Sequence, residues 1–188
     1  GLTAMPVCTY DDRLLQLYGL ADARAKLPRQ CGKALAAIHS IPTGSTPSEL
    51  QLSDGQAQIA QYEEIYRQFK APRPVFELAL QWLKANAPTP RATVLVHGDF
   101  RLGNLMVDET GLAAVLDWEL AHLGDPREDI AWVCVNSWRF GQSQNRVGGF
   151  GQLEDLLEAY NARAGTDISL GDIDWWEMLG SLKWGVMC

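Results

Sequence analysis

Residues 96–129 read VHGDFRLGNLMVDETGLAAVLDWELAHLGDPRED, and this stretch decides the fold. A short β-branched run leads into it, and two apolar runs flank the turn sequence Asp108-Glu109-Thr110-Gly111. Apolar runs joined by such a turn are typical of a β-hairpin. We therefore expect a strand, a polar loop and then a hairpin, with strands at 93–96, 104–107 and 112–116.

Polar residues of the loop and the hairpin carry the chemical signal. His97, Asp99 and Asn104 fit the pattern H-x-D-x-x-x-x-N, and Asp117 follows the hairpin at the end of a strand. In kinase catalytic loops, the Asp of this pattern accepts the proton of the substrate hydroxyl, while the Asn and a further Asp hold magnesium. The spacing puts Asp99 and Asn104 at the two ends of one loop, and the hairpin returns Asp117 to their side. Oxygen ligands of this kind suit Mg²⁺.

HGDFRLGNLM (97–106) followed by LDWELAHLGDPRED (116–129) resembles the C-terminal lobe of the aminoglycoside phosphotransferase family, which has a protein-kinase-like fold. The resemblance is specific around residues 94–132 and looser on either side. It implies that residues 1–188 are one phosphotransferase lobe, a fragment of a larger two-lobe domain. It also implies a small-molecule kinase, which uses ATP and Mg²⁺ to transfer a γ-phosphoryl group to a hydroxyl. The variant looks most like the branch found alone in bacteria or joined to acyl-CoA dehydrogenases, so the acceptor is expected to be a hydroxyacyl-CoA or an aminoglycoside-like molecule.

The resemblance also gives each loop residue a role. Asp99 matches the catalytic carboxylate, while Asn104 and Asp117 match the nucleotide-binding magnesium ligands; the alternatives are an ordinary loop Asp, a turn-capping Asn and a strand-end Asp. Arg101 lies where protein kinases carry a lysine that touches the transferred phosphate, and a solvated or substrate-facing arginine is equally compatible. His97 is expected to buttress the loop rather than to react.

Further polar and glycine-rich positions have mainly structural interpretations. Asp125 is expected to be the N-cap of a helix, with Pro126 at its first position. Asp129, one turn into that helix, resembles the family's buried Asp that ties down the catalytic loop. Glu119 belongs either to a second metal or acceptor site or to the hydrogen-bonded surroundings of the site. The segment Gly148–Gly151 is either a loop near the acceptor or a plain helix entry, because no strand precedes it as nucleotide motifs require.

Helical spacing of apolar residues accounts for most of the remaining chain. The turn-rich stretch 41–53 is expected only to join two helices. The fold class is therefore α+β, a mostly helical lobe with short hairpins. Tryptophans at 118, 132, 138, 175, 176 and 184 are expected to pack in the core or at its rim. The expected helices are 21–40, 53–69, 74–86, a helix beginning at 126, 152–163 and 172–188.

Composition excludes several other classes of protein. The 188 residues include 16 Lys+Arg and 23 Asp+Glu, a net charge of −7, which argues against nucleic-acid binding and against polybasic membrane attachment. No apolar run approaches the roughly 18 residues of a membrane span, and Gly1–Tyr10 does not resemble a secretory signal. The four scattered cysteines are expected to be free thiols in a reducing cytosol, so we expect a cytoplasmic protein.

A complete kinase-like enzyme also has an N-terminal lobe with a phosphate-covering loop and a strand lysine. None of the five lysines follows a glycine loop on a β-branched strand. We therefore expect that lobe to be absent from these residues, and the chain alone to be weakly active or inactive. The absent lobe leaves a non-catalytic binding or regulatory module as the alternative, although the intact motif counts against it.

A metal-dependent hydrolase built on His97, Asp99 and Asp117 would have too few ligands for a di-metal site, because the three histidines of the chain are widely spaced. A serine hydrolase is weaker still, since no G-x-S-x-G occurs.

Overall fold

The computed structural model describes residues 5–6 and 23–188 and has an α+β fold in which helices dominate. The helices are α2 (Ala23–His39), α3 (Gly55–Gln68), α4 (Pro74–Ala85), α5 (Arg127–Trp132), α6 (Leu153–Ala164) and α7 (Leu170–Met187). The strands are β1 (Met5–Pro6), β2 (Val94–Val96), β3 (Leu105–Asp108), β4 (Gly111–Val115) and β5 (His122–Gly124). The expected helices and the hairpin are confirmed to within a few residues at their ends.

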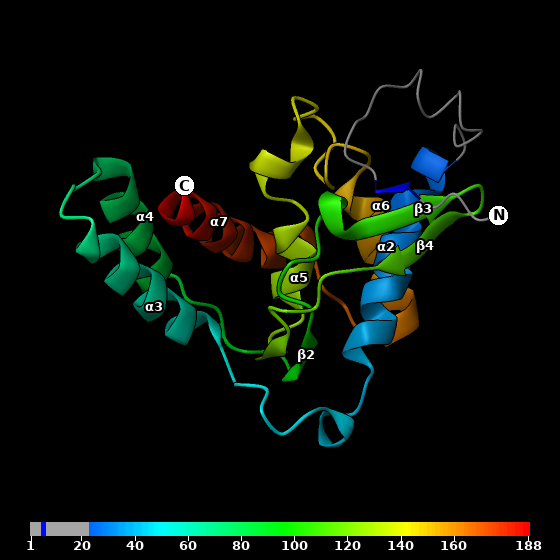
Figure 1. The fold of residues 1–188 in the computed structure, drawn as a ribbon, viewed down its shortest axis with the longest axis horizontal. Helices are drawn as coiled ribbons and strands as arrows, with labels where there is room; N and C mark the ends of the chain where they lie inside the picture. Colours follow the sequence, from blue (N-terminus) through cyan, green and yellow to red (C-terminus); the bar gives the residue numbers. More distant parts are fainter. Residues whose placement is uncertain (1–4, 7–22) are drawn as a thin grey trace.

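The elements form two groups around a central helix (Figure 1). Helices α2 and α6 pack together beside the β3–β4 hairpin at one end, and α3 and α4 lie at the other. Helix α5 lies between the two groups, and α7 packs against α5, α3 and α4. The loop between β2 and β3 therefore lies at the centre of the lobe, supported from both ends.

Two small antiparallel sheets direct the chain into this centre. One has the strand order β1-β3-β4, and Asp108 pairs with Gly111 where its hairpin turns. The other joins β2 to β5, pairing Val94 with Gly124 and Val96 with His122. The stretch 41–53 does more than join two helices, because Leu52 forms a parallel bridge to β5.

Close backbone packing fixes α2 against α6. The apolar positions of α2 that helical spacing predicts, among them Cys31 and Leu35, are fully buried. Between them, a Cβ atom at Gly32 would lie 2.2 Å from the carbonyl oxygen of Leu156 on α6. Only glycine leaves room for this contact, so the two helix backbones approach more closely than side chains allow.

Helix α5 is short, and all six of its residues are buried. The expected cap is displaced by one residue: Pro126 is the N-cap residue, with α5 beginning at Arg127, rather than the first helical residue. The Asp125 carboxylate still accepts the backbone N–H of Arg127 at 3.0 Å and the Arg127 guanidinium at 2.7 Å. This buried ion pair orients the guanidinium inward and leaves proline, which has no N–H to satisfy, at the cap position.

The cysteine and tryptophan expectations are confirmed where the structure describes them. Cys31 and Cys134 are buried free thiols and Cys188 is an exposed one, whereas Cys8 lies outside the described residues. Four tryptophans are buried, Trp184 is half-buried, and Trp118 is 40% exposed at the rim.

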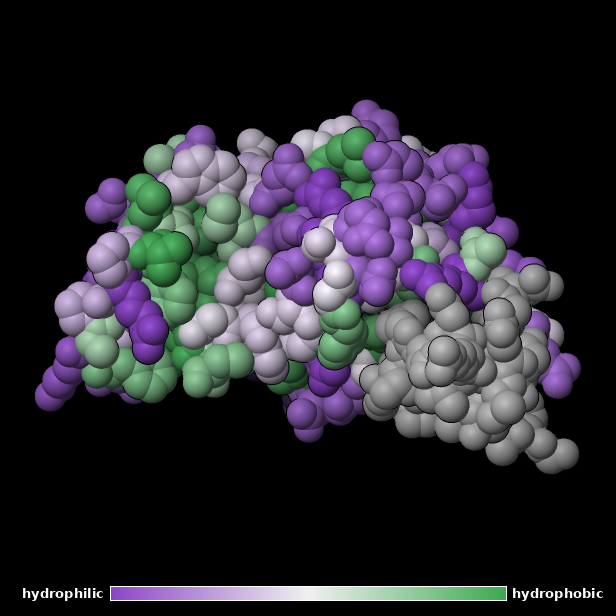
Figure 2. Space-filling model, turned by 90° about the horizontal axis from the view of Figure 1, so that it is seen from above, coloured by the Kyte–Doolittle hydropathy of each residue, from purple (hydrophilic) through white to green (hydrophobic). Residues whose placement is uncertain are grey.

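Exposed apolar residues gather at the α3–α4 end of the molecule, the left side of the surface view (Figure 2). They include Phe69, Val75, Leu78 and Trp82. No helix in residues 23–188 is both long and apolar enough to span a bilayer.

Candidate active site

The candidate site is the loop that follows β2, and a glycine lets it turn. Gly98 has φ +82°, and a Cβ atom there would lie 2.3 Å from the carbonyl oxygen of Leu120. Any other residue would have to displace the backbone around Leu120. The loop therefore lies directly against the segment that joins β4 to β5.

Asp129 on α5 fixes the start of this loop. Its carboxylate accepts the backbone N–H groups of His97 and Gly98 at 2.8 and 2.9 Å, and the side chain is fully buried. The same carboxylate contacts His39 Nε2 at 3.1 Å, and His39 Nδ1 lies 2.9 Å from the Tyr160 hydroxyl. Since His39 belongs to α2 and Tyr160 to α6, Asp129 connects the loop to the helix pair.

Asp99 is the centre of a compact hydrogen-bond cluster. Its Oδ1 accepts the indole N–H of Trp132 at 2.7 Å, and its Oδ2 accepts the amide N–H of Asn104 at 2.7 Å. Arg101 Nε donates to both oxygens at 3.0 and 3.1 Å. The Asp99 side chain is 13% exposed, so one side of this carboxylate still faces solvent. The structure thus brings Asp99, Arg101 and Asn104 into direct contact.

Arg101 has more donors than the cluster uses. Its guanidinium stacks over the Trp138 ring, with the central carbon 5.0 Å from the ring centroid. Within the described residues, no acceptor is recorded for its two terminal nitrogens, and the side chain is 30% exposed. These N–H groups can take a further anion, because a guanidinium can bind two oxygens side by side.

His97 lies beneath the loop with both ring nitrogens engaged. The backbone N–H of Asp99 donates to Nδ1 at 3.2 Å, so the ring proton lies on Nε2, which donates to the Leu116 carbonyl at 3.0 Å. The ring also packs against Trp118 at a centroid distance of 4.5 Å. This arrangement suits a supporting role, because neither nitrogen faces a reacting group.

Backbone hydrogen bonds of its neighbour Leu116 hold Asp117 close to the site. The Leu116 N–H donates to the Asn104 carbonyl at 2.8 Å, and the Leu116 carbonyl accepts from His97. Asp117 is exposed and has φ +67°, a left-handed conformation that Asp and Asn adopt more readily than most residues. The hairpin therefore places Asp117 next to the loop that carries Asp99 and Asn104.

The side-chain oxygens of Asn104 and Asp117 are of the kind that Mg²⁺ binds. The Asn104 side-chain nitrogen donates to Asp99, so the Asn104 side-chain oxygen does not face Asp99. The described residues offer the Asp117 carboxylate no hydrogen-bond donor. Mg²⁺ typically binds through one or two such side chains together with phosphates and water. Across 5–6 and 23–188 there is no cluster of three or more His, Cys, Asp and Glu side chains able to hold a metal. A metal site here would therefore depend on a bound phosphate.

A buried ionic network supports α5 from the opposite side. Glu128 lies 3.0 Å from Lys183 Nζ on α7, and it accepts from Gln58 on α3 at 2.6 Å. His122 Nε2 lies 3.0 Å from the same carboxylate. Burial alone would raise the pKa of Glu128, but the charges of Lys183 and His122 and their hydrogen bonds lower it to about 2. Lys183 also lies 5.2 Å from the centroid of the Trp132 ring, which connects the network to Asp99.

Comparison with known proteins agrees with this arrangement. A family model described as the phosphotransferase enzyme family matches residues 8–168. This chain belongs to the phosphotransferase enzyme family. The resemblance seen in the sequence is thereby confirmed.

Relatives of the phosphotransferase chain fall into two groups. Mouse acyl-CoA dehydrogenase family member 10 is 37% identical over 109 residues, which cover 55% of this chain and 10% of that protein. Among solved structures, aminoglycoside-3'-phosphotransferase of type VIII has a TM-score of 0.69 at 14% identity, covering 97% of this chain and 66% of that one. An aminoglycoside phosphotransferase from Streptomyces rimosus, solved with ADP and streptomycin, has a TM-score of 0.58 at 18% identity, covering 88% and 65%. At these identities the solved structures show a shared fold.

Two tryptophans contact the candidate site in a way that was not predicted from the sequence. Trp132 donates to Asp99, and Trp138 supports Arg101, although both were expected only to pack. The signal for Trp132 was its spacing: it follows Asp129 by three positions, so both lie on one helix face, which is turned toward the loop.

The structure also shows where Glu119 and the segment Gly148–Gly151 lie, for which the sequence left two interpretations each. Glu119 is exposed in the segment before β5. The segment Gly148–Gly151 forms a turn that leads into α6, and a Cβ atom at Gly149 would lie 2.4 Å from the Arg139 carbonyl. This close approach explains the glycine without a ligand.

Proposed function

We propose that this chain carries the catalytic carboxylate and the metal ligands of an ATP-dependent phosphotransferase that acts on a hydroxyl group of a small molecule. One observation supports this most directly. Asp99 is held by three side-chain donors at the end of a loop that Asp129 anchors from below. A base must be held within hydrogen-bond reach of the proton that it takes, and this cluster provides such positioning.

Asp99 and Arg101 act in sequence on the two reactants. Arg101 bonds to Asp99 in the resting site, and its terminal N–H groups have no acceptor among the described residues, so it turns toward the transferred phosphoryl oxygens when these arrive. Its departure frees lone pairs of Asp99, which then accepts the proton of the attacking hydroxyl as that oxygen bonds to the γ-phosphorus and ADP leaves. Trp132 and Asn104 keep the carboxylate in place meanwhile.

Asn104 and Asp117 would hold the magnesium ion through their side-chain oxygens. When bound, Mg²⁺ would neutralise the negative charge that develops on the phosphate. The chain's own contribution is to keep Asp117 beside the loop that carries Asp99 and Asn104, through the Leu116 backbone contacts.

The side chains around Asp99 favour a hydroxyacyl-CoA over an aminoglycoside as the acceptor. Arg101 places a cation beside the carboxylate and over the Trp138 ring, and the half-buried Trp184, which packs on Trp138, adds an apolar surface. An anionic, partly apolar molecule suits this surface better than a polycation, which would repel Arg101. The name of the mouse relative, acyl-CoA dehydrogenase family member 10, agrees with an acyl-CoA acceptor.

Calorimetric titration of the chain with ATP in excess Mg²⁺ tests the metal ligands. Asp117→Asn keeps a residue that tolerates the left-handed backbone but removes the charge, and Asp155→Asn on the exposed start of α6 is the matched control. We expect Asp117→Asn to lose metal-dependent binding and the control to keep it. Equal binding by both variants would overturn the assignment of Asp117.

Single-turnover transfer from γ-labelled ATP to a hydroxyacyl-CoA tests the base. Only a small amount of labelled product is expected with the unaltered chain, which we expect to be weakly active alone, and it should disappear with Asp99→Asn. Product that persists without the Asp99 carboxylate would refute its role. If ATP binds but neither protein forms product, the same pair of proteins extended by an N-terminal lobe separates the two interpretations: an enzyme gains activity that depends on Asp99, and a non-catalytic module does not.

A further inference from the structure

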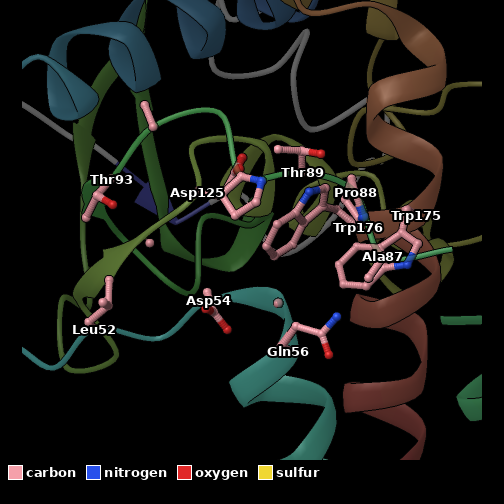
Figure 3. Close-up of a pocket in the computed structure, with 14 residues that line it drawn as sticks. Leu52, Asp54, Gln56, Ala87, Pro88, Thr89, Thr93, Asp125, Trp175 and Trp176 are labelled. Atoms are coloured by element: carbon pink, nitrogen blue, oxygen red, sulfur yellow. The ribbon is translucent and has the colours of Figure 1, made fainter. Parts of the chain in front are cut away.

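A pocket of about 240 Å³ lies at the end of the β2–β5 sheet that faces away from the catalytic loop (Figure 3). Thr93 precedes β2 and lines the pocket, whereas His97 follows β2 and begins the loop. The strand between them rises roughly 3.3 Å per residue, so about 13 Å separates Thr93 from His97. None of the residues that line the pocket belongs to the Asp99 cluster.

The walls of the pocket are formed by the flat rings of two tryptophans and by two prolines. Trp175 and Trp176 of α7 stand nearly perpendicular, with ring centroids 5.0 Å apart and an interplanar angle of 80°. They form one side of the pocket, and Pro88 and Pro90, from the segment after α4, also line it. A Cβ atom at Gly55 would lie 2.7 Å from the Trp175 ring, so glycine brings the first turn of α3 to the same wall. Such surfaces suit an aromatic ring system.

The charged side chains that line the pocket, Asp54 and Asp125, are both acidic. Asp54 lies at the rim as the N-cap of α3, and its Oδ1 accepts the Ala57 N–H at 2.8 Å, which leaves Oδ2 without a donor among the described residues. Asp125 lines the floor, but both of its oxygens are occupied by Arg127 and by the backbone of Arg91. No lysine or arginine of the part of the chain that the structure describes lines the pocket. A ligand that offers hydrogen-bond donors or positive charge is therefore favoured at Asp54.

We propose that this pocket binds a single flat heteroaromatic bicycle with an amidine-like donor edge. Its rings lie against Trp175, Trp176 and the two prolines, and its donor edge meets the free oxygen of Asp54. Pockets for drug-sized ligands hold roughly 300–1,000 Å³, so a cavity of 240 Å³ accepts one bicyclic system and little more. The proposal is independent of phosphotransfer, because the pocket shares no side chain with the catalytic cluster.

The test uses 2-aminobenzimidazole as the probe, against 2-methylbenzothiazole, a bicycle of similar size without N–H donors. Indole N–H resonances of the ¹⁵N-labelled chain report binding at Trp175 and Trp176. We expect the first probe to shift both resonances with a Kd on the order of 1 mM, as a fragment of about ten heavy atoms allows. The second probe should bind at least tenfold more weakly.

Three variants check the geometry. Asp54→Asn keeps a good N-cap while removing the charge, and it should weaken binding about tenfold. Ala92→Leu adds bulk at a lining position that is itself exposed, and it should abolish binding without unfolding the chain. Asp155→Asn, far from the pocket on α6, should bind as the unaltered chain does. Absence of shifts at Trp175 and Trp176, equal affinity for both probes, or unchanged affinity in Asp54→Asn would each overturn the proposal.

Discussion

Glu128 offers the sharpest test of the packing beneath the catalytic loop. Its side chain is 5% exposed and contacts Lys183, Gln58 and His122. Burial would raise its pKa, yet these partners lower the pKa from an ordinary 4.5 to about 2. Each pKa unit corresponds to about 1.4 kcal/mol, so ionised Glu128 contributes about 3 kcal/mol to stability at neutral pH. Because the folded-state pKa is the lower one, this contribution is complete above about pH 5 and is lost as the pH falls towards 2.

Glu128→Gln should therefore lower the free energy of unfolding by at least about 3 kcal/mol near neutral pH, since Lys183 also loses its charged partner. Urea unfolding of both proteins at several pH values between about 7 and 3 measures the difference, which should shrink with acidity. Glu154→Gln, an exposed carboxylate at the start of α6, should stay within about 0.5 kcal/mol throughout. A difference for Glu128→Gln that is equally large at both ends of the pH range would refute the reasoning.

Three further outcomes follow from the contacts around α5. Asp129→Asn replaces a carboxylate that accepts two backbone N–H groups with an amide that presents a donor to one of them, so the chain should lose about 3 kcal/mol of stability in thermal unfolding; an unchanged Tm would contradict the anchoring role. Trp132→Phe removes the 2.7 Å hydrogen bond to Asp99 but keeps an aromatic ring, so phosphotransfer should fall about tenfold in a single-turnover assay; a matching fall in the exposed control Trp82→Phe would refute a specific effect. Burial disfavours charged His122, but its hydrogen bond and ion pair with Glu128 outweigh this and raise its pKa, so the stability it adds is complete below about pH 6.5 and is lost as the pH rises through the raised value. His122→Gln should remove that alkaline decline in unfolding measured between about pH 6 and 9, and a decline that persists would assign it to another group.

Local signals predicted the elements that depend on neighbouring residues. The β3–β4 hairpin follows from its turn sequence, and α2 follows from apolar positions three or four apart, because such patterns act within one turn or one loop. β5 was missed, since its three residues become a strand only by pairing with β2, nearly thirty positions earlier. The bridge from Leu52 to β5 was missed for the same reason.

At the candidate site, too, contacts between neighbouring residues could be predicted and contacts between distant residues could not. Asp99 and Asn104 were expected to be close because one short loop joins them, and their side chains do form a hydrogen bond. The contact from Trp132 to Asp99 spans 33 positions and depends on how α5 is rotated against the loop. A tryptophan in an apolar helix is usually a packing residue, so composition alone could not identify this donor.

The complete burial of α5 has a consequence for the pattern of tolerated variation. A helix of six residues makes fewer than two turns, and such a segment usually leaves one face open to substitution. In a saturation library scored for folded protein, α4 should show intolerant positions spaced three or four apart, because its exposed side includes Val75, Leu78 and Trp82. Positions 127 to 132 should instead form an unbroken block of intolerance. Selection for a stable fold would then already preserve the side chains that support the loop carrying Asp99, even in a lineage where its proposed chemistry is no longer needed.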